Sequence, residues 1–388
     1  MIPPRGFQKS EFEARVAKAQ HLMASSNLDA LLLTTEPEVR YFTGYLTRFW
    51  ESPTRPWFLV VPQTGKPIAI IPSIGADLMC STWIDDVRAW RSPDLADDGV
   101  SLLSQALVEI AGPKGNVGLP MSHETHVRMP LEDYHRLSAN VAPITLRDDA
   151  GIMRSLRLIK SPSEIEKIQH ACSIAGKAFE AVPKFAHPGI ALEDVFRDFQ
   201  ISCLQQGADW VSYLAGGAGP DGYTDVISPA TQTPLDNGDI LMLDTGLVWD
   251  GYFCDFDRNF AIGKPSTIAS NTHQKLLEAV HEAAQTAKPG VTASDLFHVM
   301  NKILTGGESL SEAGRLGHGL GMKLTEWPSL IPGDHTVLEE GMVLTLEPGI
   351  ETGQGRMMVH EENIVITADG AEFLSPLAGS ALDICGGS

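Results

Sequence analysis

The chain has 388 residues, which suggests about two domains that can each bury a core of their own. With 43% hydrophobic and 20% charged residues, its composition is that of an ordinary globular protein. A formal net charge of −20 argues against nucleic acid and anionic membrane surfaces as partners, because both repel an acidic protein.

The first part of the chain alternates between helical and strand patterns. Ser10 and Glu13 have the spacing of a capping box, which predicts a helix that runs to about Ser25. Strands and helices are then expected at Leu28–Leu33, Trp57–Val61, Ile68–Ile71, 100–110, Asn116–Leu119 and 130–138. This alternation predicts an α/β domain over residues 1–155.

One segment of this domain, Arg48–Trp57, concentrates aromatic side chains and guanidinium groups. Trp50 can hold a cationic head by a cation–π contact, and Arg48 can bind a carboxylate with two hydrogen bonds. A small zwitterionic substrate would satisfy both side chains. The alternative is that Trp50 and Trp57 pack in the core and the arginines are solvated.

The second part of the chain does not follow a strict strand–helix–strand order. Ser161 and Glu164 form another capping-box pattern, before a long helix that we expect to reach about Phe185. Further helices are expected at 192–206, 270–287 and 293–305, with strands and tight turns over Trp210–Ile262 and 313–374. This arrangement predicts an α+β domain over residues 156–388.

Five residues of this second domain are candidate metal ligands: Asp244, Asp255, His318, Glu347 and Glu361. Asp244 and Glu347 each end an apolar run, where a buried carboxylate costs several kcal/mol unless a cation meets it. His318 lies between small residues that allow the backbone to approach a ligand closely. Any one of the five can be a turn or loop residue, but their occurrence together beside apolar strands favours a metal site.

Four carboxylates and one imidazole suit paired first-row divalent ions, whereas a structural zinc site usually recruits thiolates. Two ions about 3.5–4 Å apart, bridged by carboxylates and a water, form a hydrolytic centre. Such a centre makes hydroxide available near neutral pH for attack on a carbonyl or amidine carbon. The sequence therefore predicts a hydrolase with two divalent metal ions.

The order of these segments and their local sequence motifs resemble those of the creatinase/aminopeptidase P/prolidase family of pita-bread metalloenzymes. The family motifs correspond here to Asp244–Gly246, Gly251–Arg258, Gly317–Gly321, Glu347–Gly349 and Glu361–Asn363. Leu156–Ile165 also resembles the hinge that leads into the catalytic domain of family members. Tyr41–Tyr45 resembles a recurring sequence motif of their N-terminal domain. The resemblance covers nearly the whole chain and implies a creatinase/prolidase-like N-terminal domain followed by a pita-bread catalytic domain.

The resemblance also implies the roles of the five candidates. Asp244, Asp255 and Glu361 would hold one ion, and Asp255, His318, Glu347 and Glu361 the other, with Asp255 and Glu361 as bridges. The ions expected are manganese, zinc, cobalt or iron. Glu347 resembles the ligand that shuttles a proton from the bridging water to the leaving group, so Glu347 and His318 are the expected catalytic residues. A homodimer is a further implication.

Three positions depart from the pattern common among peptidase members. Gly219–Ser228 lacks a histidine that those members carry, Thr325 stands where another histidine is common, and Val359 where an arginine is common. Residues close to these positions are candidate substrate contacts in their place, namely Tyr223, Asp225, Thr325, Glu326 and His360. For Asp225 the alternative is a simple turn residue.

Three functions remain open on these grounds. The first is hydrolysis of a peptide C–N bond, as in aminopeptidase P and prolidase. The second is action on a small zwitterion, as in creatinase, ectoine hydrolase or the dimethylsulfoniopropionate lyases of this fold, which the missing histidines favour. The third is a binding module without catalysis, against which the intact set of five candidates argues.

The location of the protein is also an expectation. The five cysteines are scattered and odd in number, which fits reduced thiols better than a disulfide framework. The first residues lack an apolar signal segment, and no apolar stretch approaches the length of a membrane span. We therefore expect a cytoplasmic enzyme that acts on a small molecule or a short peptide.

Overall fold

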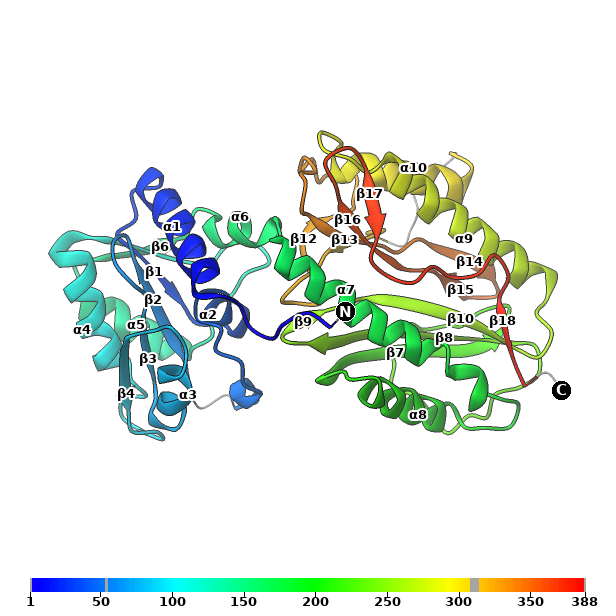
Figure 1. The fold of residues 1–388 in the computed structure, drawn as a ribbon, viewed down its shortest axis with the longest axis horizontal. Helices are drawn as coiled ribbons and strands as arrows, with labels where there is room; N and C mark the ends of the chain where they lie inside the picture. Colours follow the sequence, from blue (N-terminus) through cyan, green and yellow to red (C-terminus); the bar gives the residue numbers. More distant parts are fainter. Residues whose placement is uncertain (1, 53–54, 308–313, 387–388) are drawn as a thin grey trace. The chain divides into compact units, whose positions relative to one another are not determined.

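The computed structural model describes residues 2–52, 55–307 and 314–386 (Figure 1). The chain divides into two compact units, which are Pro4–Arg157 and the combination of Met1–Pro3 with Leu158–Ser388. Residues 53–54 of the predicted aromatic segment and residue 313 of the predicted strand region lie outside the described residues.

A six-stranded mixed sheet forms the centre of the first unit, in the order β4-β3-β2-β1-β5-β6. Its strands are β1 (Ala30–Leu33), β2 (Phe58–Pro62), β3 (Ile68–Pro72), β4 (Asp86–Trp90), β5 (Asn116–Leu119) and β6 (Thr145–Asp148). The helices are α1 (Lys9–Ser25), α2 (Glu36–Thr43), α3 (Ala76–Cys80), α4 (Val100–Ala111), α5 (Leu131–Val141) and α6 (Ile152–Leu158). Apolar side chains of α4 and α5 share one core with β1, β2, β3 and β5, which confirms the α/β class.

The two predicted capping boxes have opposite outcomes. The one at Ser10 and Glu13 is wrong, because helix α1 begins earlier, after Gln8, whose side chain makes no capping hydrogen bond. The one at Ser161 is confirmed: its hydroxyl accepts from the Glu164 amide at 3.3 Å, and the Ser161 amide donates to the Glu164 carboxylate at 2.9 Å. The helix it starts ends at Phe179, before the predicted end.

The second unit contains two five-stranded sheets and a separate hairpin. The first sheet has the order β18-β10-β8-β7, with β9 paired to β8. Its strands are β7 (Trp210–Pro220), β8 (Asp239–Trp249), β9 (Tyr252–Phe253), β10 (Phe256–Ile262) and β18 (Asp383–Cys385). The second sheet has the order β12-β11-β13-β16-β17, with strands β11 (His318–Gly319), β12 (Glu326–Ser329), β13 (Val343–Leu346), β16 (Glu362–Ile366) and β17 (Ala371–Phe373). The hairpin joins β14 (Gly349–Gly353) to β15 (Arg356–Val359).

In the part of the second unit that the structure describes, three helices pack on these sheets and a fourth packs against one of the three. Helices α7 (Pro162–Phe179) and α8 (Leu192–Gln205) contact β8 and β7 of the first sheet. Helix α9 (Thr267–Thr286) contacts β13, β17 and the hairpin, and α10 (Ala293–Thr305) packs against α9 (Figure 1). Mostly antiparallel sheets with helices packed outside them confirm the α+β class.

Strand pairing explains why residues that are distant in sequence can meet. Antiparallel pairing of β8 with β10 sets Asp257 opposite Asp244, and Asp255 directly precedes β10. Pairing of β13 with β16 sets Leu346 opposite Glu362, so the residues just outside these two strands, Glu347 and Glu361, come from neighbouring strand ends.

The short strand β11 requires glycine next to His318. A Cβ atom on Gly319 would lie 1.9 Å from the carbonyl oxygen of Trp327, which no side chain could tolerate. The glycine thus permits the close approach of β11 to β12. Among the helices that the structure describes, none combines the length and apolar character needed to cross a membrane.

Candidate metal centre and active site

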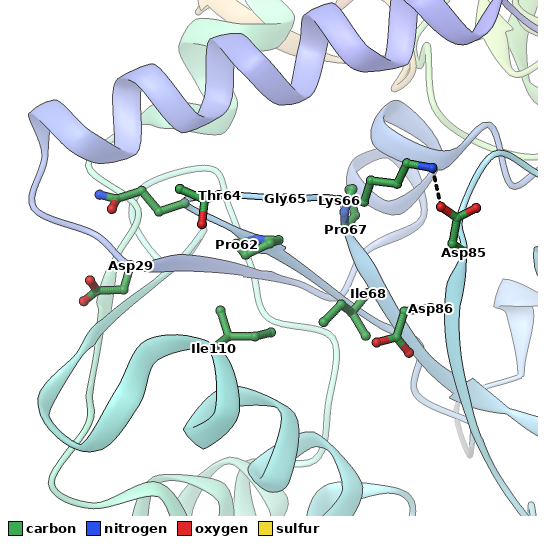
Figure 2. A pocket seen from close by; sticks show the side chains of 11 residues that line it. Asp29, Pro62, Thr64, Gly65, Lys66, Pro67, Ile68, Asp85, Asp86 and Ile110 are labelled. Atoms are coloured by element: carbon green, nitrogen blue, oxygen red, sulfur yellow. Dashed lines mark hydrogen bonds and ion pairs between the residues drawn. The ribbon is translucent and has the colours of Figure 1, made fainter.

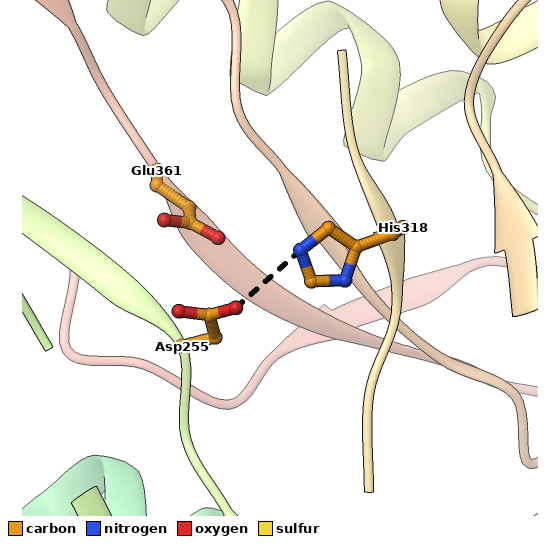
Figure 3. Close-up of side chains that lie close together, drawn as sticks. All are labelled: Asp255, His318 and Glu361. Atoms are coloured by element: carbon orange, nitrogen blue, oxygen red, sulfur yellow. Dashed lines mark ion pairs between the residues drawn. The ribbon is translucent and has the colours of Figure 1, made fainter. Parts of the chain in front are cut away.

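Three of the five candidate ligands form a tight buried group, with one ligand atom from each lying within 4.8 Å of the others. Figure 3 shows the side chains of Asp255, His318 and Glu361 pointing toward one another from three separate segments. The Nε2 atom of His318 lies 3.4 Å from Oδ2 of Asp255. All three residues are at most 4% exposed, so water does not compensate their charges.

The other two candidates, Glu347 and Asp244, lie beside this group. Oε2 of Glu347 is 3.9 Å from the same His318 nitrogen. The charge of Asp244 acts on both Asp255 and Glu361. The structure therefore groups Asp255, His318 and Glu361, with Glu347 beside His318. Asp244 lies on β8, which pairs with β10, the strand that directly follows Asp255.

Of the four carboxylates, Asp255 and Glu361 are buried and Asp244 and Glu347 partly buried, and Arg315, which pairs with Glu347, supplies too little positive charge for all four. Burial, reinforced by mutual repulsion, raises the pKa values of Asp244, Asp255 and Glu361 well above the ordinary range. Burial also raises the pKa of Glu347, to about 7. Oδ1 of Asp244 and Oε1 of Glu361 are buried with no hydrogen-bond partner in the described part of the chain.

The imidazole of His318 is set up as a neutral ligand. Burial lowers its pKa to about 4, so the ring is uncharged at neutral pH. Its Nδ1 lies 2.8 Å from the carbonyl oxygen of Gly319, and because a carbonyl only accepts, Nδ1 must carry the proton. Nε2 then presents a lone pair to the carboxylate of Asp255. Two electron-pair donors facing each other at 3.4 Å fit a cation between them, and the oxygen-rich donor set suits first-row divalent ions.

A second set of residues holds the candidate ligands in place. The side-chain oxygen of Asn363 accepts from the Asp255 amide at 3.0 Å, and its NH₂ group donates to the Asp255 carbonyl. The Cys172 thiol donates to the same Asn363 oxygen at 3.3 Å. Oδ1 of Asp257 accepts from the amide of Glu361 at 3.1 Å. These contacts fix the backbone of the two proposed bridging carboxylates.

Behind this set, His360 lies in a buried chain of charges. Its Nδ1 is 3.4 Å from Asp257 and its Nε2 is 3.3 Å from Glu362, which pairs with Arg258 at 3.0 Å. Burial opposes the charge on His360, but the two carboxylates outweigh it and raise its pKa. Burial alone would raise the pKa of Glu362, yet Arg258 and His360 lower it to about 2. These partners favour a positioning role for His360 over the substrate contact predicted for it.

The remaining predicted substrate contacts of this unit differ in their surroundings. The Tyr223 hydroxyl is buried, accepts from the Val359 amide at 2.7 Å and donates to Asn259 at 3.2 Å. Glu326 is buried against Lys160 at 3.3 Å and accepts from two backbone amides. These contacts favour structural roles for Tyr223 and Glu326.

Two predicted contacts are exposed. Asp225 accepts hydrogen bonds from the amides of Ile227 and Ser228 at 2.7 and 3.0 Å, which is the turn geometry of the alternative interpretation. Thr325 is also exposed, and its hydroxyl lies 3.5 Å from Nη2 of Arg315. Because Arg315 itself contacts Glu347, Thr325 is connected to this candidate ligand through Arg315.

The two predicted substrate contacts of the first unit, Arg48 and Trp50, both interact with residues of that unit. Trp50 is 8% exposed, with its ring centroid 5.7 Å from that of Trp57 and 5.5 Å from the Arg128 guanidinium. This agrees with the alternative of a core tryptophan. Arg48 is exposed and pairs with Glu51. The substrate contacts of both residues stay predictions.

A shallow cavity of about 480 Å³ lies elsewhere in the first unit, beside the turn at residues 63–67 (Figure 2). Its cation Lys66 already pairs with Asp85. Neither Arg48 nor Trp50 lines it.

Two residues near the carboxylates were not predicted. Tyr213 donates a hydrogen bond to Asp244, and burial together with the nearby carboxylates raises its pKa. A bulge between Val211 and Tyr213 shifts the pairing of β7 with β8, so a regular strand pattern does not reveal this contact. Arg315 could have been found from its position three residues before His318.

Comparison with known proteins gives the chain a family. The sequence model of metallopeptidase family M24 matches residues 166–368, and that of the creatinase/prolidase N-terminal domain matches residues 15–159. The chain is 27% identical to a Xaa-Pro dipeptidase of Pyrococcus horikoshii, over 93% of this chain and 96% of the relative. It is 29% identical to a probable dipeptidase PepE of Mycobacterium tuberculosis, over 95% of each.

The fold comparison agrees. The crystal structure of dipeptidase PepE from Mycobacterium ulcerans superposes with a TM-score of 0.83, at 25% identity, and covers 98% of this chain and 99% of that one. The resemblance seen in the sequence and the expected pita-bread fold are thus confirmed. The chain belongs to metallopeptidase family M24 and is a metallohydrolase.

Proposed function

We propose that this protein hydrolyses a C–N bond in short peptides of the Xaa-Pro type, with two divalent ions held by Asp244, Asp255, His318, Glu347 and Glu361. The observation that carries the proposal is the neutral His318 nitrogen facing Asp255 among carboxylates with unpaired buried oxygens. Relatives named Xaa-Pro dipeptidase and dipeptidase support the substrate class. Manganese, zinc, cobalt or iron, a homodimer and a cytoplasmic location remain predictions.

Bound divalent ions supply Lewis acidity, which activates water and polarises the scissile carbonyl. The chain's own residues place the reacting groups. Asn363 and Asp257 hold the backbone of Asp255 and Glu361, so these carboxylates keep one orientation. The hydrogen bond of Nδ1 to Gly319 fixes the ring of His318.

Glu347 is the residue suited to proton transfer. One of its oxygens, Oε1, accepts from Arg315 at 3.2 Å, while Oε2 faces His318. Its raised pKa of about 7 reflects burial without enough positive charge around it. Ions bound beside it would lower this pKa, and the Glu347 carboxylate would then be suited to accept a proton from the attacking water and return it to the leaving amine.

A second candidate function is action on a small zwitterion instead of a peptide. It is favoured by the exposed Thr325 beside Arg315, in a position where an imidazole is common in peptidases. A binding module without catalysis has no comparable support, because it would have no need for four neighbouring carboxylates with raised pKa values.

The test combines metal analysis with a substrate panel. Protein reconstituted with Mn²⁺, Zn²⁺, Co²⁺ or Fe²⁺ should retain two ions per chain by mass spectrometry, and Asp244→Ala should retain fewer. The metal-loaded protein should hydrolyse Xaa-Pro dipeptides. Xaa-Pro tripeptides, creatine, acetylated diamino acids and sulfonium propionates are assayed under the same conditions for comparison. Turnover confined to the small zwitterions would replace the peptidase by the second candidate. Failure to retain any ion would remove the proposed centre altogether.

A further inference from the structure

A fifth carboxylate, that of Asp257, lies beside the candidate metal centre. Antiparallel pairing of β10 with β8 sets Asp257 directly opposite Asp244. Side chains that are directly opposite each other lie on the same face of a sheet, with Cβ atoms about 4.5–5.5 Å apart. After burial, the charge of Asp257 is the largest influence that raises the pKa of Asp244. The two carboxylates are therefore close neighbours.

The two oxygens of the Asp257 carboxylate have different surroundings. Oδ1 accepts from the Glu361 amide at 3.1 Å and lies 3.4 Å from Nδ1 of His360. Oδ2 is buried and has no hydrogen-bond partner in residues 2–52, 55–307 and 314–386. The next residue, Arg258, directs its guanidinium to the carboxylate of Glu362 instead. With Asp257 only 1% exposed, an anionic oxygen left without a donor or a cation destabilises the fold.

The same deficit occurs on two of the candidate ligands. Oδ1 of Asp244 and Oε1 of Glu361 are also buried without a hydrogen-bond partner among the described residues. Like Asp244, Asp257 lies outside the tight group formed by Asp255, His318 and Glu361. It nevertheless faces Asp244 across the strand pair and contacts the Glu361 amide through Oδ1. One cation close to all three carboxylates would satisfy their unpartnered oxygens.

We propose that Asp257 is a fourth carboxylate ligand, through Oδ2, of the ion assigned to Asp244, Asp255 and Glu361. The proposal rests on the two-ion centre of the proposed function and goes beyond it by giving one ion a metal preference. Oxygen-only donor sets suit Mn²⁺, whereas zinc sites in proteins are usually four-coordinate and include nitrogen or sulfur. Asp257 therefore improves the binding of Mn²⁺ relative to that of Zn²⁺ at this ion.

A simpler role for Asp257 is that of a counter-ion for His360. In that role the carboxylate acts only through the imidazole or through the Glu361 backbone. Asparagine keeps an oxygen that can accept from the Glu361 amide, but it lacks the negative charge that a metal ligand supplies. Asp257→Asn therefore tests the ligand role, and the same substitution in a His360→Gln protein removes the contribution of the counter-ion.

The experiment measures the binding of Mn²⁺ and of Zn²⁺ to metal-free protein by calorimetry, for wild type, Asp257→Asn, His360→Gln and the double variant. We expect Asp257→Asn to weaken Mn²⁺ binding at one of two sites by about 10- to 100-fold, and Zn²⁺ binding by less than about tenfold, with or without His360. Asp239→Asn is the control and should bind both ions as wild type does. Asp239 is another buried aspartate of the β8–β10 sheet, and it accepts from the Asp236 amide at 2.9 Å.

Three results of this titration overturn the proposal. They are an unchanged Mn²⁺ affinity in Asp257→Asn, equal losses for the two metals, and a loss that disappears in the His360→Gln protein. Circular dichroism of each variant checks that the fold is intact.

A crystal structure of wild type loaded with Mn²⁺ gives a readout that needs no variant. An Asp257 oxygen at about 2.2 Å from an ion supports the proposal. If two ions bind and neither contacts Asp257, the ligand role fails while the two-ion centre stands. If wild type binds no ion at these carboxylates, the centre itself fails, and the ligand role of Asp257 fails with it.

Discussion

The cluster of carboxylates predicts an unusual response to mutation: Glu347→Gln should stabilise the protein in the presence of a chelator. The pKa of Glu347 rises from 4.5 to about 7 in the folded chain, chiefly because of burial. A pKa shift of this size means that the ionised form of Glu347 destabilises the folded state by about 3 kcal/mol. Glutamine keeps the shape of the side chain and removes the charge.

The sign of the pH dependence follows from proton binding. Between pH 4.5 and about 7 the folded chain binds more protons at Glu347 than the unfolded chain. The stability of metal-free wild type therefore falls as pH rises through this window and levels off above it. The advantage of Glu347→Gln should grow from less than about 1 kcal/mol at pH 5 to about 3 kcal/mol at pH 8.

The assay is urea unfolding with a chelator at pH 5, 6, 7 and 8, with amide hydrogen exchange of Val343–Leu346 reporting on the second unit. Glu351→Gln, on an exposed glutamate of β14, is the control and should show no such pH dependence. With saturating metal the order should reverse, because Glu347→Gln removes a proposed ligand. A variant no more stable than wild type at pH 8, or an effect that does not change with pH, would refute the reasoning.

Three further predictions concern residues around the centre. Asn363→Ala removes the contacts that hold Asp255 and should weaken metal affinity by about 10- to 100-fold in calorimetry, with an unchanged circular dichroism spectrum; unchanged affinity contradicts the positioning role. Asp225→Ala should leave kcat/KM within about twofold of wild type, because its carboxylate accepts hydrogen bonds within its own turn, and a large loss would restore it as a substrate contact. In the native protein a thiol reagent should modify exposed Cys80 and spare Cys172 and Cys254, whose burial raises their thiol pKa values; rapid modification of either buried thiol contradicts this.

The features that could be predicted from the sequence are those marked by a pattern among residues close together in the chain. Asp244 and Glu347 were found because a carboxylate directly after an apolar run is physically costly, and the structure partly buries both near other carboxylates. The helices at 192–206, 270–287 and 293–305 were found from apolar periodicity, and their observed bounds differ by at most a few residues.

What the sequence did not predict depends on partners that are far apart in the chain. The burial of Glu326 requires Lys160, and that of Tyr223 requires Asn259 and Val359. No local pattern joins these residues. Strands β4 and β6 and helix α2 were also missed, because each is short and gains its stability from the sheet or helix next to it.

The two five-stranded sheets contribute different members of the centre. Asp244 and Asp255 come from the sheet that contains β8 and β10, while His318, Glu347 and Glu361 come from the sheet that contains β11, β13 and β16. Ions held between them would act as a cross-link joining two halves of the catalytic unit. Without ions the same groups must either repel one another across the two sheets or take up protons, so the two halves of the unit would be joined less firmly than in the metal-bound protein.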